Sequence, residues 1–383
     1  MSDSLTSTPL SDGFRMPAEF EPHQGCWMLW PTRPDNWREY AKPAQRAFAA
    51  VAHAIAQFEP VSVGVGAAQF DEARRLLEPR IRVVRLESDD AWMRDVGPTG
   101  VVGPKGEVRG VDWHFNAWGG LDGGLYFPWD RDELVARRVL ALEGLSRYRA
   151  PFVCEGGALH SDGEGTLLVT EECLLNKNRN PGLGRRQLET LLKAYTGTTE
   201  IIWLGRGVFN DETDGHVDNL ACFVAPGEVA LLWCDDPRDP QAPISRDAFV
   251  RLSDARDARG RRLKIHRIPM PGPLEMTDIE AAGLLPRPGT KPRRGGERLA
   301  ASYVNFYIAN GGVVVPMLDR RFDAKFIAQL QRIFPNRRVV GVPAREILLG
   351  GGNIHCITQQ IPRGRQRERQ STPRYALRSR AGK

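Results

Sequence analysis

Short apolar runs alternate with amphipathic segments along most of the chain. Eight runs are rich in β-branched residues and have the length of strands: 61–65, 81–86, 166–169, 200–204, 229–233, 264–268, 313–315 and 338–342. Apolar residues at positions 44, 47, 48, 51, 54 and 55 follow the helical period within 42–57. Strands that alternate with helices of this length predict an α/β protein.

Five segments show a helical pattern: 42–57, 70–77, 130–143, 185–195 and 323–334. The segment 130–143 starts with Asp130, which we expect to cap it. Residues 269–296 are rich in Pro and Gly and predict a long connecting loop. At the ends of the chain, we expect residues 1–15 to form a flexible leader and residues 363–383 to form a basic, disordered tail.

Composition narrows the class of protein. The net charge of +6 arises in the tail 363–383, which holds eight basic residues and one acid, whereas the other 362 residues hold 45 basic and 46 acidic residues. The body therefore does not predict a nucleic-acid-binding surface, although a polyanion-binding role of the tail stays open. The longest apolar runs are far shorter than the roughly 20 residues of a membrane span. Six widely spaced cysteines without a CxxC pair do not form the pattern of a secreted disulfide framework, which favours the cytoplasm.

Several standard catalytic motifs are missing from the sequence. It contains no GxxxxGK[ST], no GxSxG and no HExxH. Four other segments combine glycines with reactive side chains: Trp92–Thr99, Cys154–Gly157, Asp211–Asn219 and Gly350–Cys356.

The acidic segment 211–219 places four carboxylates and one histidine within eight residues. Such clusters are usually solvated loops, but His216 and Asp218 are two positions apart and would point the same way in an extended chain. Because no second His or Cys has ligand spacing nearby, catalysis is favoured over a metal site, and we expect no metal.

Cys356 follows three consecutive glycines. A lone cysteine is most often a buried core thiol, but glycines let backbone amides and a substrate approach the sulfur. A nucleophilic cysteine can use a histidine that is remote in sequence, and His216 is the candidate.

The acids of these segments suggest the substrate class. Asp95, Glu155, Glu212 and Asp218 occur together with Trp92 and Trp118, a combination that suits a planar cation with N–H forks, the guanidinium group. Attack by a cysteine on the guanidinium carbon would displace ammonia, and water would then cleave the S-linked intermediate without any cofactor.

Residues 14–362 closely resemble the agmatine deiminases of the guanidine-modifying, or pentein, superfamily. The resemblance rests on the order and spacing of eight segments: 16–23, 92–95, 123–130, 155–160, 176–181, 214–219, 302–307 and 351–360. It implies one catalytic domain, 16–362, built of five ββαβ units around a pseudo-fivefold axis, a five-bladed α/β propeller with the site in its central channel. It also implies a cytoplasmic enzyme of polyamine (putrescine) synthesis that forms dimers or larger homo-oligomers.

The resemblance further implies a role for each candidate residue. Cys356 would be the nucleophile, and His216 would act as general acid and then as general base. Asp95 and Asp218 would hold the guanidinium, and Glu155 would contact His216 or the guanidinium. Glu212 would receive the distal amine of agmatine, Trp92 would form a wall of the site, and Gly352 would let the substrate approach.

The electrostatics of such a site have a consequence for the thiol. Acids around Cys356 would raise the pKa of its thiol in the empty site, and the bound guanidinium would favour the thiolate.

Other functions remain open from the sequence. A deiminase of free or peptidyl arginine would need a positive group for the carboxylate, whereas agmatine calls for an acid, and Glu212 favours agmatine. An amidinotransferase is less favoured. A binding protein on the same fold would not need Cys356 and His216, and an RNA-associated protein would depend on the tail.

Overall fold

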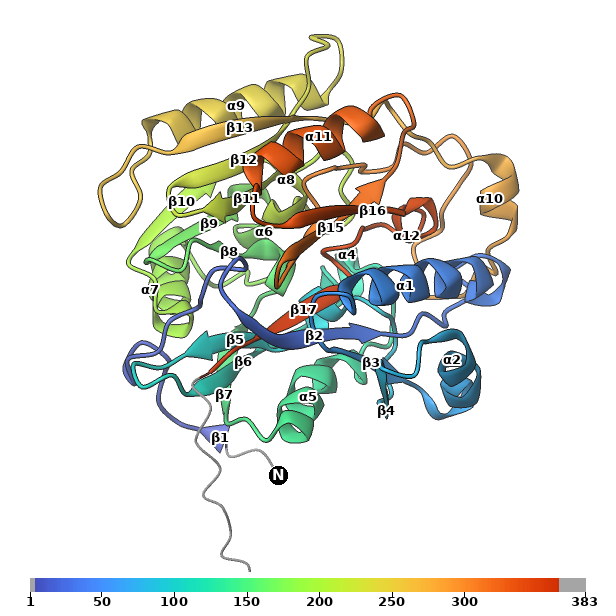
Figure 1. Cartoon of the computed structure of the whole chain (residues 1–383), viewed down its shortest axis with the longest axis horizontal. Helices are drawn as coiled ribbons and strands as arrows, with labels where there is room; N and C mark the ends of the chain where they lie inside the picture. Colours follow the sequence, from blue (N-terminus) through green and yellow to red (C-terminus); the bar gives the residue numbers. More distant parts are fainter. Residues whose placement is uncertain (1–3, 365–383) are drawn as a thin grey trace, which may run out of the picture.

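The fold is assembled from five small β-sheets with helices at the periphery (Figure 1). The computed structural model describes residues 4–364. In these residues one connection recurs five times: two antiparallel strands, a helix, and a third strand that lies parallel to the second. The α/β class predicted from the pattern is confirmed.

Four of the units follow one another along the chain. The first consists of β5 (Thr99–Val102), β6 (Val108–His114), α5 (Val135–Glu143) and β7 (Arg147–Val153). The second consists of β8 (His160–Ser161), β9 (Thr166–Thr170), α7 (Arg185–Thr196) and β10 (Glu200–Leu204), with the short helix α6 (Glu171–Leu174) after β9. The third consists of β11 (Ala221–Ala225), β12 (Glu228–Trp233), α9 (Gln241–Asp254) and β13 (Lys264–Pro269). The fourth consists of β14 (Tyr307–Ala309), β15 (Gly312–Met317), α11 (Asp323–Ile333) and β16 (Arg338–Pro343).

The fifth unit joins the two ends of the described chain. Its first strand, β17 (Thr358–Pro362), pairs antiparallel with β2 (His23–Leu29), which continues through α1 (Lys42–Ile55) to β3 (Val61–Val65). The helix α2 (Phe70–Leu76) and the edge strand β4 (Arg82–Arg85) complete it. Residues just after Cys356 are thereby hydrogen-bonded to a strand more than 300 positions earlier.

The apolar core lies between the sheets and their helices. The helix α1 shows why the 3.6-residue pattern forms it, because Phe48, Val51 and Ile55 on one face are each at most 1% exposed. Burying a side chain of this size stabilises the fold by roughly 1.5–3 kcal/mol. Two further clusters cover β11–β16 with α9 and α11, and β5–β10 with α7.

The N-terminal segment corrects one prediction. We expected 1–15 to be a flexible leader, but Ser4–Leu5 form a strand, β1, that pairs parallel with β7. Phe14 is 4% exposed and belongs to the core, and Leu10 donates its backbone N–H to the Ala194 carbonyl. Two short apolar anchors thus order a segment whose average composition is polar. The tail predicted for 363–383 lies outside the described residues from position 365 onward.

Two local predictions also need correction. The Pro- and Gly-rich stretch 269–296 contains a helix, α10 (Asp278–Ala282), because Thr277 and Glu280 cap each other reciprocally. Asp130 does not cap the helix after it, which starts with a 3₁₀ turn at Asp132–Leu134. Asp132 instead accepts the backbone N–H groups of Asp89 and Asp90.

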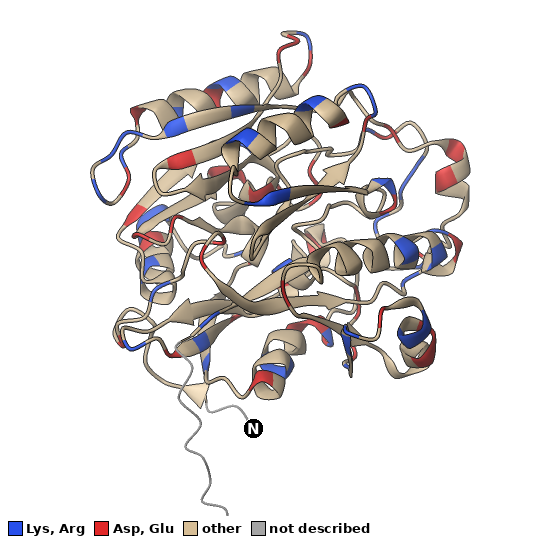
Figure 2. Ribbon diagram, in the orientation of Figure 1, with Lys and Arg blue, Asp and Glu red and all other residues tan. Residues whose placement is uncertain are grey.

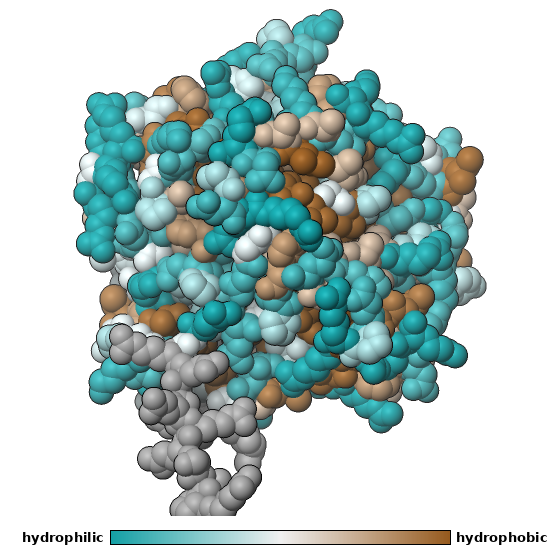
Figure 3. All heavy atoms as spheres, viewed as in Figure 1, coloured by the Kyte–Doolittle hydropathy of each residue, from teal (hydrophilic) through white to brown (hydrophobic). Residues whose placement is uncertain are grey.

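Surface properties agree with the charge analysis of the body. Basic and acidic positions are interspersed along the ribbon (Figure 2), and the face shown in Figure 3 is mostly hydrophilic with scattered apolar groups. Among residues 4–364, no helix combines the length and the apolar character needed to cross a bilayer.

Candidate active site

Each of the five units contributes a short segment directly before its first strand. These segments are α3 (Met93–Val96), the 3₁₀ turn Gly156–Ala158, α8 (Val217–Leu220), residues 302–305 and residues 353–356. They carry Asp95, Glu155 with Gly157, His216 with Asp218, Asn305, and Cys356. Their side chains meet in the interior, so the site draws one element from each unit.

Cys356 lies in the turn before β17 and is 6% exposed. Its Sγ is 3.6 Å from Asp218 Oδ2 and accepts a hydrogen bond from Asn305 Nδ2 at 3.2 Å. Burial raises the pKa of the Cys356 thiol well above its usual value, and the charges of Asp218 and Asp95 raise it further. The thiol is therefore neutral in the empty site, the direction expected from the surrounding acids.

His216 lies directly before α8 and is 1% exposed. Its Nε2 is 3.6 Å from Glu155 Oε2, and its Nδ1 is 3.8 Å from Asp95 Oδ1. Burial opposes the charged ring, but Asp95, Cys173 and Glu155 together hold the pKa of His216 well above its usual value. The ring is therefore an imidazolium at neutral pH and can give up a proton to a leaving group.

Asp95 is held by two donors, the Trp118 Nε1 at 3.0 Å and the backbone N–H of Gly157 at 2.9 Å. Burial raises the pKa of Asp95 to about 6, against the opposing charge of His216. The negative charges of Asp218 and Glu155 add to this increase. In the empty site, burial and two neighbouring carboxylates thus disfavour the ionised form of Asp95. A bound cation would favour it.

Asp218 and Glu155 remain ionised because each has a cationic partner. Burial alone would raise the pKa of Asp218, but His355 lowers it by donating to Oδ2 at 2.8 Å. Burial likewise opposes ionised Glu155, but Arg179 donates to its Oε1 at 2.7 Å and lowers its pKa. Among the described residues, Asp218 Oδ1 and Glu155 Oε2 have no hydrogen-bond partner. Both oxygens are free to accept from a guanidinium or its leaving group.

Gly157 forms the floor beneath these groups. A Cβ on this residue would lie 2.5 Å from His216 Nδ1, 2.9 Å from Asp95 Oδ1 and 3.0 Å from Asp218 Oδ2. The missing side chain is what lets the histidine and the two carboxylates converge.

Gly352, predicted to let the substrate approach, is needed for a related reason. A Cβ there would lie 2.6 Å from the Trp92 ring and 3.1 Å from Cys356 Sγ. The glycine thus makes room between the indole and the thiol.

A pocket with about 480 Å³ of atom-free space, the solvent at its mouth included, reaches Cys356 and Asp95. Trp92, Glu212 and Gly352 also line it. Asp218 and His216 are not among the lining residues but lie next to them, Asp218 at 3.6 Å from the Cys356 sulfur and His216 at 3.8 Å from Asp95. The Trp92 side chain lines the cavity and also packs in the core on Trp37, with ring centroids 5.2 Å apart.

Glu212 lines the cavity but is not a free carboxylate. Its Oε2 is 2.6 Å from Arg293 Nη2, and its Oε1 is 3.7 Å from Lys291 Nζ. A cationic amine would have to share or displace these partners. The assignment of Glu212 to the distal amine stays a prediction.

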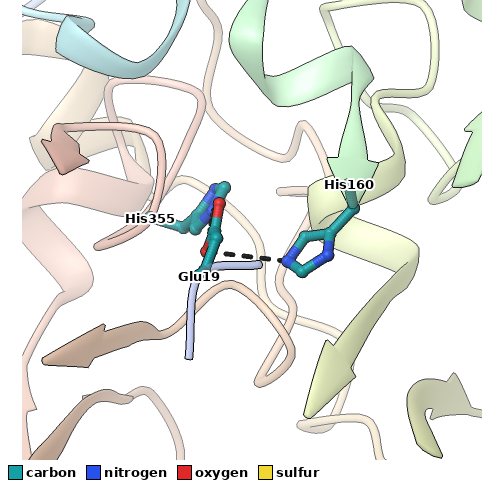
Figure 4. A group of neighbouring side chains, drawn as sticks. All are labelled: Glu19, His160 and His355. Atoms are coloured by element: carbon teal, nitrogen blue, oxygen red, sulfur yellow. Dashed lines mark hydrogen bonds and ion pairs between the residues drawn. The ribbon is translucent and has the colours of Figure 1, made fainter. Parts of the chain in front are cut away.

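Two groups of buried side chains have donor atoms close enough for a metal: Glu19 with His160 and His355 (Figure 4), and Glu155 with Cys173 and His216. Each group already has a guanidinium on its carboxylate, Arg94 at 3.0 Å from Glu19 and Arg179 at 2.7 Å from Glu155. These fixed cations repel a metal ion and satisfy the charge that would attract one.

Sequence reasoning placed Gly157 in a candidate segment without giving it a role, and it missed three further residues that support the site. Asn305 and His355 stand inside the quoted segments, but nothing in the sequence indicates their contacts. Cys173 stands outside them, yet its sulfur lies within 4.8 Å of the nearest donor atoms of Glu155 and His216.

Comparison with known proteins agrees with this geometry. Residues 15–362 match the family model of the Porphyromonas-type peptidyl-arginine deiminases. The agmatine deiminase of Ectopseudomonas mendocina (strain ymp) is 58% identical over 361 residues, 94% of this chain and 98% of that protein. The agmatine deiminase of Pseudomonas aeruginosa (strain LESB58) is 59% identical over 363 residues, 94% of this chain and 99% of that protein.

A solved structure of the agmatine deiminase of Enterococcus faecalis superposes with a TM-score of 0.92 at 48% identity, covering 95% of this chain and 100% of that one. The resemblance inferred from the eight segments is thereby confirmed. With its family model matched over most of its length, the chain belongs to the Porphyromonas-type peptidyl-arginine deiminase family.

Proposed function

We propose that this chain is an agmatine deiminase, which converts agmatine and water to N-carbamoylputrescine and ammonia. The observation that carries the proposal is the buried Cys356 thiol, 3.6 Å from Asp218 in a cavity that also exposes Asp95. The imidazolium of His216 lies within 4 Å of both Asp95 and Glu155. The names of relatives at 58–59% identity support the substrate.

Binding sets up the reaction. Asp95 and Asp218 accept N–H groups of the guanidinium and hold its carbon over Cys356 Sγ. The added positive charge offsets the two carboxylates and lowers the pKa of the thiol, so that the substrate itself promotes the thiolate.

Two chemical stages follow. The thiolate adds to the guanidinium carbon, and His216 protonates one terminal nitrogen, so the C–N bond breaks and ammonia leaves. The product of this stage is an amidino group bound to Cys356 Sγ. Neutral His216 then takes a proton from water, and the hydroxide adds to the same carbon. The new hydroxyl loses its proton to the departing ammonia or to solvent as the C=O bond forms and the C–S bond breaks, which releases the carbamoyl product and the thiolate.

The pH dependence of kcat/KM should have an acid limb near pH 6. A carboxyl group whose pKa is raised to about 6 takes up a proton as the pH falls through that value, and neutral Asp95 no longer attracts the guanidinium. We expect kcat/KM to fall about tenfold per pH unit below the limb. The limb of kcat should lie at lower pH, because bound guanidinium stabilises the ionised carboxylate.

Circular dichroism at each pH would separate this limb from acid unfolding. A kcat/KM that stays constant well below pH 6 in a folded protein would contradict the assignment of Asp95.

The substrate is tested by supplying agmatine, free arginine and an arginine-containing peptide to the purified protein and measuring ammonia and carbamoyl product. We expect turnover of agmatine, with mass spectrometry of quenched enzyme showing an amidino adduct on Cys356. Turnover of arginine alone would keep the chemistry and change the substrate. No turnover of any of them by folded protein would overturn the catalytic proposal.

One observation favours arginine as the second candidate. Arg33, Lys291 and Arg293 line the same cavity as Glu212 and could receive a carboxylate. Arg33 is paired with Asp35, and Arg293 with Glu212, so agmatine remains the first choice.

We further propose that the five units surround a pseudo-fivefold axis, with the site at the axis. The recurrent strand order and the contribution of one segment per unit support this arrangement. Six free, buried cysteines support a cytoplasmic location, and a homo-oligomer is the state implied by the family resemblance.

A further inference from the structure

His355, the residue directly before Cys356, is placed between two carboxylates. Its Nδ1 is 2.8 Å from Asp218 Oδ2, and its Nε2 is 2.8 Å from Glu19 Oε1. The side chain is 3% exposed. Figure 4 shows Glu19 between the rings of His355 and His160, which come from opposite sides.

This geometry determines the charge of the ring. A neutral imidazole carries one N–H and one lone pair, so one of its two nitrogens would direct a lone pair at a carboxylate. An imidazolium donates from both nitrogens and satisfies both partners. Burial and the nearby Arg94 oppose the charge, but Glu19 and Asp218 raise the pKa of His355 overall.

The groups around His355 balance its charge. Glu19 also accepts from Arg94 Nη1 at 3.0 Å, and His160 Nε2 lies 3.6 Å from the other oxygen of Glu19. Burial would favour neutral Glu19, but Arg94, His355 and His160 hold its pKa well below the usual value. The side chains of Arg94, Glu19, His355 and Asp218 thus form a row in space whose charges alternate. The row ends at Asp218, 3.6 Å from the Cys356 sulfur.

We propose that His355 is a positioning residue that bridges Glu19 and Asp218 as a doubly donating imidazolium, which keeps Asp218 ionised and leaves its Oδ1 free for the guanidinium. The inference rests on the proposed function for the identity of the guanidinium. His355 does not act on the reacting atoms itself; it acts through Asp218.

The decisive variant is His355→Gln. Glutamine carries no charge and can donate to only one of the two carboxylates, so the pKa of Asp218 should rise. We expect protonation of Asp218 to add to that of Asp95 on the acid side of the kcat/KM profile, so that the fall in kcat/KM begins at higher pH than in the wild type. At neutral pH kcat/KM should fall ~10–100-fold, the range known for outer-shell partners of metal ligands. KM should change more than kcat, because Asp218 then binds the guanidinium less tightly.

His160→Gln is the matched control. His160 stacks on His355 and approaches the same Glu19, but its Nδ1 accepts the Phe223 backbone N–H and does not reach Asp218. This variant should lower thermal stability and keep the wild-type pH profile. A His355→Gln protein that also loses only stability and keeps that profile would overturn the inference.

If His355→Gln does not fold, Glu19→Gln answers the same question. It removes the far carboxylate, so the ring no longer needs a second proton, and the acid limb should move in the same direction. An unshifted limb in this variant would contradict the role of His355.

A measurement independent of turnover separates this inference from the proposed function. Nitrogen NMR of histidine-labelled wild-type protein should show two buried rings protonated on both nitrogens at neutral pH, those of His216 and His355. The signal that disappears in folded His355→Gln protein belongs to His355, and this signal should shift in Glu19→Gln. A neutral His355 ring would overturn the inference even in an active enzyme. Wild-type protein that turns over no guanidine substrate but shows the doubly protonated ring would overturn the proposed function alone.

Discussion

Replacing Cys356 by alanine should abolish agmatine turnover, with kcat falling by at least about 10⁴-fold, the scale seen when a covalent nucleophile is removed. The reason is specific to the mechanism, because without the sulfur no amidino intermediate can form. Binding should persist, since Asp95 and Asp218 still hold the guanidinium. Calorimetry with agmatine should therefore detect binding to a protein that releases no ammonia.

Cys234→Ala is the control for losing a buried thiol. Cys234 is 5% exposed and contacts the Asp236 carbonyl, and it does not line the catalytic cavity. It should keep wild-type kcat. Substantial turnover by Cys356→Ala would rule out covalent catalysis at this position.

Substrate-promoted ionisation is tested on the wild-type protein by thiolate absorbance. The raised pKa of the Cys356 thiol predicts little thiolate at neutral pH in the empty site. A guanidinium ligand that does not react should increase it, with Cys356→Ala as the blank. Equal absorbance with and without the ligand would show that the nucleophile is activated in another way.

Replacing Gly157 by alanine should lower kcat/KM by about 100-fold or more, since displacements near 1 Å cost this much in positioned sites. A methyl group there would press on His216, Asp95 and Asp218 at once, at 2.5–3.0 Å. We also expect a loss of stability of about 1–3 kcal/mol from overpacking. Steady-state kinetics and thermal unfolding would measure the two effects.

Gly182→Ala controls for the backbone effect of the substitution. No atom lies within 4 Å of a Cβ built on Gly182, and its φ is not in the left-handed region. Its activity should equal that of the wild type. If Gly157→Ala were as active as the wild type, catalysis would not require His216, Asp95 and Asp218 to lie this close together, and the proposed arrangement would be wrong.

The segments that meet at the candidate site could be identified from the sequence. Cys356, His216, Asp95, Asp218 and Glu155 stand in segments rich in glycine, where side-chain packing alone does not explain the residue types. The eight predicted strands and five helices are present because each has a local pattern, as in 42–57, whose apolar face is buried as the period requires.

Elements with weaker local patterns were missed. The strand β2 (His23–Leu29) has no β-branched residue, and β7 (Arg147–Val153) contains two arginines and a proline. The helix α9 (Gln241–Asp254) has Pro243 in its first turn. Pairing and packing with distant segments stabilise these elements, and such partners cannot be read from a local window.

The sequence by itself therefore determined the class of fold, the family and the segments that meet at the candidate site. Only the tertiary structure decided that Cys356 meets Asp218 138 positions away, that Gly157 makes room for three converging side chains, and that Glu212 is already paired with Arg293. The tertiary structure also placed His355 between Asp218 and Glu19, and Glu19 lies 336 positions before His355 in the chain. The physical reason is that charge, burial and pKa depend on neighbours in space, and here the neighbours come from several units of the fold.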